Sequence, residues 1–270
     1  DEVSQMKIAI IGCGSWGLGI GFVLQARGHQ LAYYSPFKEQ VQKLREKRTS
    51  AETLTGVELP SSWSFSTRLA QVVKDAEIVV VAVPSMAIRS VAQELGKLQL
   101  EERPIVLSLV KGVEQESLLR MSQILLKEIP WLTRTKLAVL SGPSHAEEVA
   151  RYVPTTVVVA SSSIRTAQKV QEVFSTEHFR IYTSTDVVGV ELCGALKNVI
   201  AIATGIIDGL GLGDNTKGAL LTRGLAEISR LGEQLGGQIR TFSGLAGMGD
   251  LITTCVSKHS RNRYVGEEIG

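Results

Sequence analysis

The sequence has few cysteines and histidines, and none of them are spaced as metal ligands or redox pairs. Cys13, Cys193 and Cys255 lie far apart without a CxxC pair, and the four histidines show no HExxH spacing. The sequence therefore predicts neither a metal centre nor a disulfide scaffold. Unpaired cysteines fit a reducing compartment, so we expect a cytoplasmic protein.

The chain also lacks an excess of charge and a long uninterrupted apolar run. Its 29 basic and 27 acidic residues leave a net charge of +2, which predicts neither nucleic acid nor an anionic membrane as a partner. No signal-peptide pattern precedes Met6, and the apolar run 199–207 is too short and too interrupted by glycine to span a bilayer. We expect a soluble protein whose affinity for anions, if any, comes from a local site.

The order of predicted elements indicates an α/β protein with two domains, for which 270 residues suffice. Apolar runs typical of strands covered on both faces alternate with helical patterns in the first part. The predicted strands are 7–11, 30–34, 77–83, 104–109, 136–140, 155–160 and 179–182. We expect 39–48 to be helical and 49–62 to be a polar loop. Long apolar helices follow, so we predict a Rossmann-like doubly wound parallel sheet over 1–185 and an all-helical second domain over 186–270.

A glycine-rich turn follows the first predicted strand directly. It reads Gly12-Cys-Gly14-Ser15-Trp16-Gly17 and opens a helical pattern. A GxGxxG pattern alone is weak, but its position between a buried strand and a helix, with a second strand after it, is typical of dinucleotide binding. The backbone can approach a pyrophosphate there, and the helix N-terminus offers unpaired N–H groups.

The second predicted strand ends without the acidic residue that commonly grips the ribose 2′-hydroxyl of NAD. Ser35, Pro36 and Lys38 occupy this region instead. Because a 2′-phosphate would meet no repulsion, we expect NADP or NAD to be accepted, with a preference for NADPH.

Four loops with chemically useful residues follow the carboxyl ends of predicted strands. They are the glycine turn, the segment at Pro84, Lys111 and the turn Gly142–Ala146. Open α/β sheets bind ligands at this edge, so we expect one shared crevice.

The apolar segment 191–207 carries Lys197 and Asn198 in its middle. A buried ammonium with a lowered pKa suits proton transfer. The alternative is that Lys197 extends to solvent from a partly exposed face. We expect Asn198 to orient the helix and to take no part in the chemistry.

These motifs together resemble the bacterial-type NAD(P)-dependent glycerol-3-phosphate dehydrogenases over essentially the whole chain. The matching segments are Gly12–Gly17, Ala82–Ser85, Lys111-Gly112, Ser141–Glu148, Glu191–Asn198, Gly213–Lys217, Gly244–Asp250 and Ser260–Asn262.

The resemblance implies reversible reduction of dihydroxyacetone phosphate, a small phosphorylated triose, to sn-glycerol 3-phosphate for phospholipid synthesis. Lys197 resembles the proton acceptor of the oxidative direction, and Lys111 resembles a second catalytic lysine that contacts both substrate and cofactor. The implied substrate contacts are Lys111, Gly142, Ser144, Lys197, Asp250, Ser260, Arg261 and Asn262. The implied cofactor contacts are Gly12, Gly14, Ser15, Trp16, Gly17, Ser35, Pro36, Lys111, Ala146 and Arg261.

Physical chemistry favours some of these roles more than others. A second ammonium would lower the pKa of Lys197, and a phosphate favours a guanidinium and backbone N–H groups, as at Ser260–Asn262. Asp250 is a poor phosphate neighbour, so we expect it to bind a hydroxyl or to orient Lys197. Without the family, a loop carboxylate would be preferred for Asp250, and a solvated arginine would be as good an interpretation of Arg261.

Two departures and two alternatives complete the expectations. Pro36 stands where family members often carry arginine, which predicts a weaker or a differently built 2′-phosphate contact. We expect the natural chain to continue past Gly270. The alternatives are a two-domain β-hydroxyacid dehydrogenase and an NAD(P)-binding protein without turnover. We expect a homodimer, with the glycine-rich second domain as a possible contact face.

Overall fold

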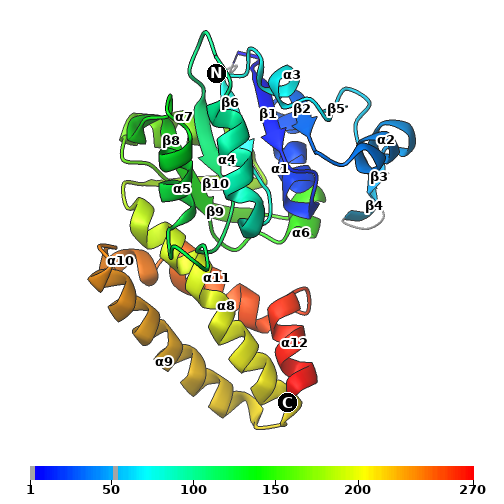
Figure 1. The fold of residues 1–270 in the computed structure, drawn as a ribbon. Helices are drawn as coiled ribbons and strands as arrows, with labels where there is room; N and C mark the ends of the chain where they lie inside the picture. Colours follow the sequence, from blue (N-terminus) through cyan, green and yellow to red (C-terminus); the bar gives the residue numbers. More distant parts are fainter. Residues whose placement is uncertain (1–3, 51–53) are drawn as a thin grey trace.

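The computed structural model describes residues 4–50 and 54–270. Figure 1 shows a sheet with helices on both sides and, below it, an elongated helical C-terminal domain. The main sheet has eight strands in the order β10-β9-β8-β7-β6-β1-β2-β5. Their bounds are β1 Lys7–Ile11, β2 Gln30–Tyr34, β5 Ser64–Ser66, β6 Ile78–Val81, β7 Ile105–Ser108, β8 Leu137–Ser141, β9 Thr155–Ala160 and β10 Phe179–Ser184.

Strand β1 shows why the sheet is covered on both faces. Ile8 and Ile10 belong to one buried cluster and Ala9 and Ile11 to another, because successive side chains point to opposite faces. The first cluster includes residues of α1 (Ser15–Ala26), α6 (Ala146–Ala150) and α7 (Ile164–Phe174). The second includes residues of α3 (Leu69–Val73), α4 (Ile88–Gly96) and α5 (Met121–Glu128). The predicted doubly wound architecture is confirmed.

The expectation that every strand is parallel is wrong at one position. Strands β8 and β9 are antiparallel, with Val139 opposite Ala160 and Ser141 opposite Val158. The reason is the short connection, because the five residues of α6 extend only about 7.5 Å at about 1.5 Å per residue. This helix cannot return the chain to the start of β8, so β9 runs back along it, and β10 then pairs with β9 in parallel.

The predicted polar loop 49–62 is also partly wrong. After α2 (Lys38–Lys47), strands β3 (Thr49–Ser50) and β4 (Leu54–Glu58) form a small antiparallel pair; residues 51–53 lie outside the described part. Buried apolar side chains anchor this region. Leu54 and Trp63 are each 1% exposed, and the Trp63 ring stacks on Tyr33 with 5.1 Å between centroids.

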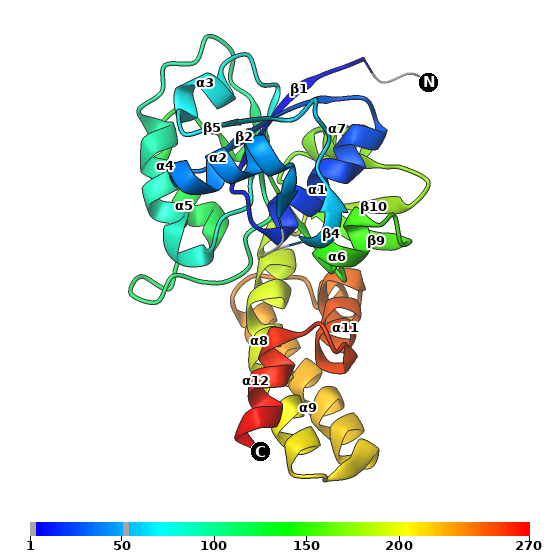
Figure 2. The same ribbon diagram turned by 90° about the vertical axis from the view of Figure 1, so that its right-hand side faces the viewer.

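The helical domain is built around the long helix α8 (Val187–Gly209), which leaves the sheet and runs the length of the domain (Figure 1). The other elements are α9 (Gly213–Gln234), α10 (Ile239–Phe242), a π-helical turn η3 (Leu245–Gly249), α11 (Asp250–Val256) and α12 (Arg261–Ile269). Figure 2 shows α11 below β9, β10 and α6, and α12 beside α8. The buried Asp186 carboxylate caps α8 at Gly189 N–H (2.9 Å) and accepts a hydrogen bond from Gln238 N–H (2.8 Å).

Helix α8 is longer than the apolar run predicted from the sequence. Its 23 residues include the run 199–207 and are long and apolar enough to cross a membrane by length and composition alone. Half of its most apolar window is buried inside the protein. Contacts with α9, α11 and α12, and the buried Glu191 and Lys197, make it the core helix of its domain.

Glycines allow α12 to lie directly on α8. A Cβ atom at Gly205 would stand 1.9 Å from the Arg263 carbonyl oxygen, and one at Gly266 would stand 2.0 Å from the Ile202 carbonyl oxygen. Asp208 adds an ion pair to the same contact, since its carboxylate accepts a hydrogen bond from Arg263 Nη1 at 2.6 Å. The close backbone contact fixes the start of α12 relative to α8.

The packing of α12 on α8 predicts that a glycine-to-alanine substitution destabilises the protein in α8 but not at an open position in α9. Gly205→Ala should destabilise the protein by about 1–3 kcal/mol, because the new methyl group collides with the α12 backbone. Gly218→Ala in α9 has open space around the new atom and should stabilise by up to about 1 kcal/mol through helix propensity. Urea unfolding of both variants measures the difference, and equal changes in free energy would contradict the assigned packing.

Candidate active site

The glycine turn has the geometry of a dinucleotide cradle. Gly12 has φ 113°, and a Cβ there would stand 2.4 Å from the Ala82 carbonyl oxygen, while a Cβ at Gly17 would stand 2.3 Å from the Gly12 carbonyl oxygen. A Cβ at Gly14 would meet no atom within 4 Å, and no side chain caps the first turn of α1 there. Two glycines thus close the turn, and the third leaves space and free N–H groups for a pyrophosphate.

The residues beside this turn differ in what they can offer a cofactor. Ser15 and Trp16 begin α1, and Trp16 packs against the sheet core. The Ser35 hydroxyl donates to Gln40 Oε1 at 2.6 Å, so it is already engaged inside the protein. Pro36 and Lys38 are exposed beside it, which leaves them as the residues available to a 2′-phosphate.

The four predicted loops lie side by side along the carboxyl edge of the sheet. The glycine turn contacts Ala82 after β6 through Gly12, as described above. The Lys111-Gly112 segment after β7 contacts Ser85, whose Cβ would be 3.2 Å from a Cβ at Gly112. Lys111 Nζ in turn donates to the Gly142 carbonyl oxygen at 3.3 Å. The loops therefore form one continuous rim, as the shared crevice requires.

Asp250 joins this rim to helix α8. Its Oδ2 accepts a hydrogen bond from Lys111 Nζ at 2.6 Å, and its Oδ1 accepts one from Lys197 Nζ at 2.6 Å. Lys111 comes from the loop after β7, Lys197 from α8 and Asp250 from the first residue of α11. The carboxylate is 2% exposed, so two ammonium groups from different domains meet on one buried anion.

Lys197 is buried, and its surroundings change its acidity. Burial, and after it the neighbouring Lys111 ammonium, lower the pKa of Lys197 from 10.5 to about 8, although Asp250 opposes the shift. The Thr254 hydroxyl, one turn after Asp250, accepts a further hydrogen bond from Lys197 Nζ and donates to the Asp250 carbonyl oxygen at 2.6 Å. A proton on Lys197 can therefore be given up near neutral pH. The alternative of a lysine that extends to solvent is wrong, because only 7% of Lys197 is exposed.

The turn after β8 lies next to this cluster. Gly142 has φ 144° and its carbonyl oxygen also accepts the Ser144 hydroxyl at 3.0 Å. Ala146 begins α6 beside α1, where a Cβ at Gly19 would be 3.1 Å from the Ala146 carbonyl oxygen. The buried Ser141 hydroxyl has no partner in the described part of the chain. The turn after β8 thus extends from Lys111 to α1, the helix that follows the glycine turn.

Glu191 holds α8 against the sheet-containing domain. Its carboxylate accepts hydrogen bonds from Ser122 N–H at 2.7 Å, from Ser122 Oγ at 2.6 Å and from Arg120 Nη1. Burial raises the pKa of Glu191, opposed by these donors. Because Glu191 and Lys197 share one helix, this anchor also sets the position of Lys197.

The Ser260–Asn262 segment begins α12 close to the same crevice. The Ser260 hydroxyl caps the helix by accepting Arg263 N–H at 3.2 Å. The preceding His259 ring lies 5.7 Å from the ring of His145, in the turn after β8. Arg261 is exposed and Asn262 is half-buried, and neither side chain is engaged with another described residue. A guanidinium thus stays available at the mouth of the site.

Sequence reasoning missed three residues of this site. Thr254 gave no signal beyond its spacing of one helical turn from Asp250, and His145 and His259 showed no ligand spacing. Burial lowers the pKa of His145, and its Nε2 is buried without a partner in the described residues. Asn198 makes no side-chain hydrogen bond within the described part, which does not support the expected orienting role.

Comparisons with known proteins agree with this geometry. A family model described as NAD-dependent glycerol-3-phosphate dehydrogenase N-terminus matches residues 7–167, and the corresponding C-terminus model matches residues 186–270. Glycerol-3-phosphate dehydrogenase [NAD(P)+] of Chlorobium limicola is 49% identical over 265 residues, which cover 98% of this chain and 79% of that protein. The enzyme of the same name from Pelotomaculum thermopropionicum is 50% identical over 98% of this chain and 75% of its own length.

A solved structure shows the same fold. The crystal structure of glycerol-3-phosphate dehydrogenase from Coxiella burnetii superimposes with a TM-score of 0.92 and 35% identity, covering 98% of this chain and 80% of that one. Sequence profile, close relatives and fold agree over nearly the whole length. The chain belongs to the NAD-dependent glycerol-3-phosphate dehydrogenase family.

Proposed function

We propose that the protein is an oxidoreductase that catalyses reversible NAD(P)H-dependent reduction of dihydroxyacetone phosphate to sn-glycerol 3-phosphate, for glycerophospholipid synthesis. The observation that carries the proposal is the buried Asp250 carboxylate, which binds Lys111 and Lys197 at 2.6 Å each. This pair lies at the carboxyl edge of a sheet that carries a dinucleotide turn, where α/β enzymes bind their ligands. The relatives' names support the substrate.

The cofactor residues provide binding and orientation. NAD(P)H supplies a hydride when it is bound. The open space at Gly14 and the uncapped first turn of α1 would hold its pyrophosphate. Ala146 and Trp16 flank the same helix. Lys38 offers an exposed ammonium to a 2′-phosphate, and no acidic residue stands between β2 and Glu39, which supports a preference for NADPH.

The two lysines have different roles toward the substrate carbonyl: Lys197 exchanges the proton and Lys111 provides positive charge. As the carbonyl oxygen gains negative charge, the Lys197 ammonium stabilises the charge and donates its proton to that oxygen. In the oxidative direction neutral Lys197 takes the proton back. Lys111 contributes a second positive charge that favours the alkoxide and lowers the pKa of Lys197. Asp250 holds both ammonium groups in place and offsets part of the repulsion between them.

The phosphate of the substrate would bind at the start of α12. Arg261 offers an unpaired guanidinium, which can bind a phosphate through paired hydrogen bonds, and Asn262 offers a second donor. Gly142, Ser144 and Ser260 would complete the pocket from the facing turn and the helix cap. The contact between His145 and His259 supports this arrangement, because it brings the two segments together.

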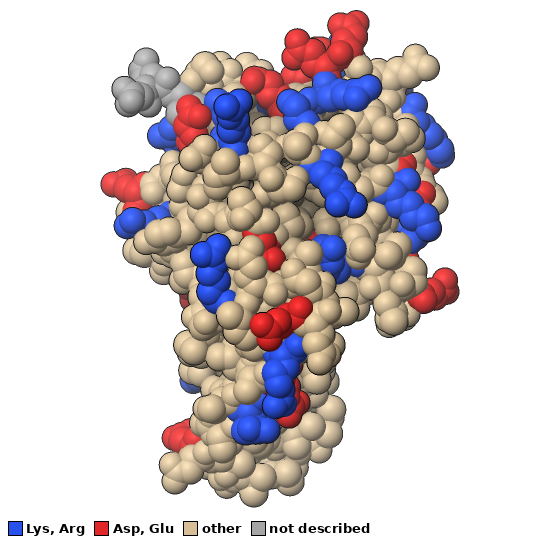
Figure 3. Space-filling model, turned by 90° about the vertical axis from the view of Figure 1, so that its left-hand side faces the viewer, with Lys and Arg blue, Asp and Glu red and all other residues tan. Residues whose placement is uncertain are grey.

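Several properties of the whole protein are also proposed. We infer a domain division near residue 185, between the end of β10 and the start of α8, a homodimer, and a cytoplasmic location. We propose no nucleic-acid or membrane partner. Figure 3 supports this for the face that it shows, where basic and acidic side chains are interspersed.

The activity is tested with NADPH and dihydroxyacetone phosphate by following NADPH absorbance. The protein should consume NADPH, and Lys197→Ala should lower kcat by about 100- to 10,000-fold, because the proton donor is lost. A β-hydroxyacid substrate serves as the control for a related dehydrogenase. NADPH that raises Tm without being consumed would indicate a binding protein and would sink the enzymatic proposal.

The low pKa of Lys197 predicts opposite pH profiles for the two directions. Reduction needs protonated Lys197, so kcat/KM should fall as pH rises through about 8. Oxidation needs neutral Lys197, so kcat/KM for sn-glycerol 3-phosphate should rise with pH and level off above about 8. Initial rates between pH 6 and 10 measure both profiles. Two profiles of the same sign would exclude Lys197 as the group that exchanges the proton.

Thr254 is predicted to position and stabilise the Lys197 ammonium. Thr254→Val removes an acceptor that favours the charged form, so the pH inflection should move to lower pH by about one unit, the equivalent of one charge-assisted hydrogen bond. Thr254→Ser keeps the hydroxyl and should restore the wild-type profile. If Thr254→Val lowers kcat without moving the inflection, the hydroxyl has a packing role instead.

A further inference from the structure

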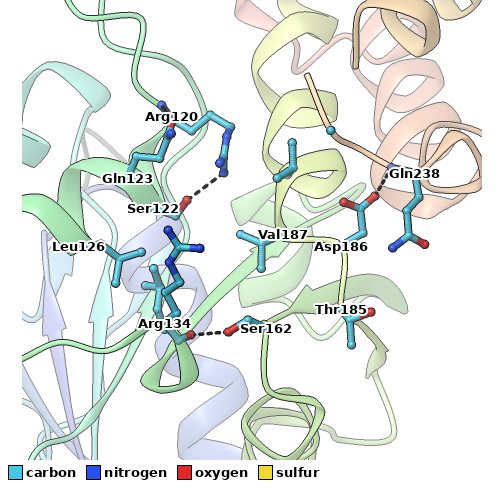
Figure 4. Close-up of a pocket in the computed structure, with 13 residues that line it drawn as sticks. Arg120, Ser122, Gln123, Leu126, Arg134, Ser162, Thr185, Asp186, Val187 and Gln238 are labelled. Atoms are coloured by element: carbon cyan, nitrogen blue, oxygen red, sulfur yellow. Dashed lines mark hydrogen bonds between the residues drawn. The ribbon is translucent and has the colours of Figure 1, made fainter. Parts of the chain in front are cut away.

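A second cavity lies at the junction of the two domains, and no candidate for catalysis or cofactor binding lines it. Its volume is about 320 Å³, within the range of sites for small molecules. Figure 4 shows that side chains from both domains extend into it. The polar residues that matter are Arg120 and Gln123 at the start of α5, Arg134 before β8, Asp186 before α8 and Gln238 before α10.

The carboxylates near this cavity are already satisfied. Asp186 accepts hydrogen bonds from the N–H groups of Gly189 and Gln238 and from the Thr241 hydroxyl at 2.6 Å. Its negative charge caps α8, where the helix dipole offsets it. Glu191, behind Arg120, is surrounded by its own donors, as described above. Neither carboxylate is therefore free to neutralise a second guanidinium.

The donors around the cavity, in contrast, are in excess. Arg120 uses only Nη1, toward Glu191 and toward Ser122 Oγ at 3.0 Å. The Arg134 guanidinium has no hydrogen bond or ion pair with the described residues, although it extends toward Arg120 (Figure 4). The amide oxygens of Gln123 and Gln238 accept hydrogen bonds from the Arg120 backbone N–H at 3.0 Å and from Arg240 Nε at 2.9 Å. The NH₂ groups of both glutamines have no hydrogen-bond partner among the described residues.

An excess of unused donors selects for a ligand rich in acceptors. We propose that this interdomain cavity binds a small organic oxyanion, a phosphate monoester or a carboxylate. Arg120, Arg134 and Gln123 hold it from the sheet-containing domain, and Gln238 holds it from the helical domain. The bound anion bridges the domains, and Arg120 links it to Glu191 on the helix that carries Lys197. The site does not depend on the proposed dehydrogenase reaction.

Titration calorimetry and thermal unfolding test the site, with inorganic phosphate and citrate as probes at constant ionic strength. Both probes should raise Tm of the wild-type protein. Arg134→Gln should weaken the binding of citrate by about tenfold, since one charge-assisted contact is lost. Gln238→Glu should weaken it similarly from the other domain. Arg223→Gln, an exposed arginine on α9, is the matched control and should bind as the wild type does. Arg134→Lys keeps the charge and should retain most of the affinity.

The outcomes separate this proposal from others. Wild-type affinity in Arg134→Gln or in Gln238→Glu overturns the bridging site, and an equal loss in Arg223→Gln shows a non-specific response to charge and overturns it as well. Inorganic phosphate can also occupy the proposed phosphate pocket at Arg261, so the two probes are compared only by the binding that Arg134→Gln removes. A preference of that binding for phosphate assigns the ligand to phosphate esters, and a preference for citrate assigns it to carboxylates. Because no cofactor or triose is present in the titration, a negative result leaves the dehydrogenase activity standing.

Discussion

The structure depends on one interaction, the binding of two ammonium groups by the buried Asp250 carboxylate. The buried charges of Asp250 and Lys197 would each be strongly unfavourable alone, and together with the partly exposed Lys111 they offset one another. The three groups come from a loop after β7, from α8 and from α11. The cluster therefore forms only when the sheet and the helical domain are assembled correctly. Burial of Lys197, and after it the proximity of Lys111 in this cluster, lower the pKa of Lys197 to about 8, so the contact that joins the domains also suits Lys197 to the proposed proton transfer.

Other buried charges at the junction of the domains are also offset by partners from neighbouring elements. Glu191 is satisfied by Ser122 and Arg120, and Asp186 by the start of α8 and by the segment that enters α10. Removing one partner from such a group leaves an uncompensated charge, which is more damaging than losing a surface ion pair. Helix α8 is thus fixed by polar contacts at its start and by close glycine contacts near its end. These polar contacts add to a buried apolar cluster in which Val139 of β8 and Ala160 of β9 pack with residues of α8 such as Leu192.

Much of this was predictable from sequence because it is local. The glycine turn, seven of the eight strands of the main sheet and the lysine in an apolar helix follow from periodicity and from residue types at fixed spacing. The short edge strand β5 (Ser64–Ser66) was not predicted. The resemblance supplied Asp250 and Arg261, for which the residues alone favoured or equally allowed a structural role. The antiparallel β9 could not be read from its composition, because its direction depends on the length of α6. The contact of Thr254 with Lys197 and the pairing of His145 with His259 join residues that are far apart in the sequence. They depend on how the elements pack, which the spacing of residues along the chain does not reveal.

Gly205 and Gly266 have a consequence for which substrates the proposed site can accept. Since α12 lies on the backbone of α8 at these two glycines, the helices that carry Arg261 and Lys197 are in direct contact. In the proposed mechanism, the packing of α12 on α8 therefore sets the distance between the phosphate contact and the proton donor. A molecule whose phosphate and carbonyl group are spaced differently would not reach both groups, so the helix contact would select substrates by their length.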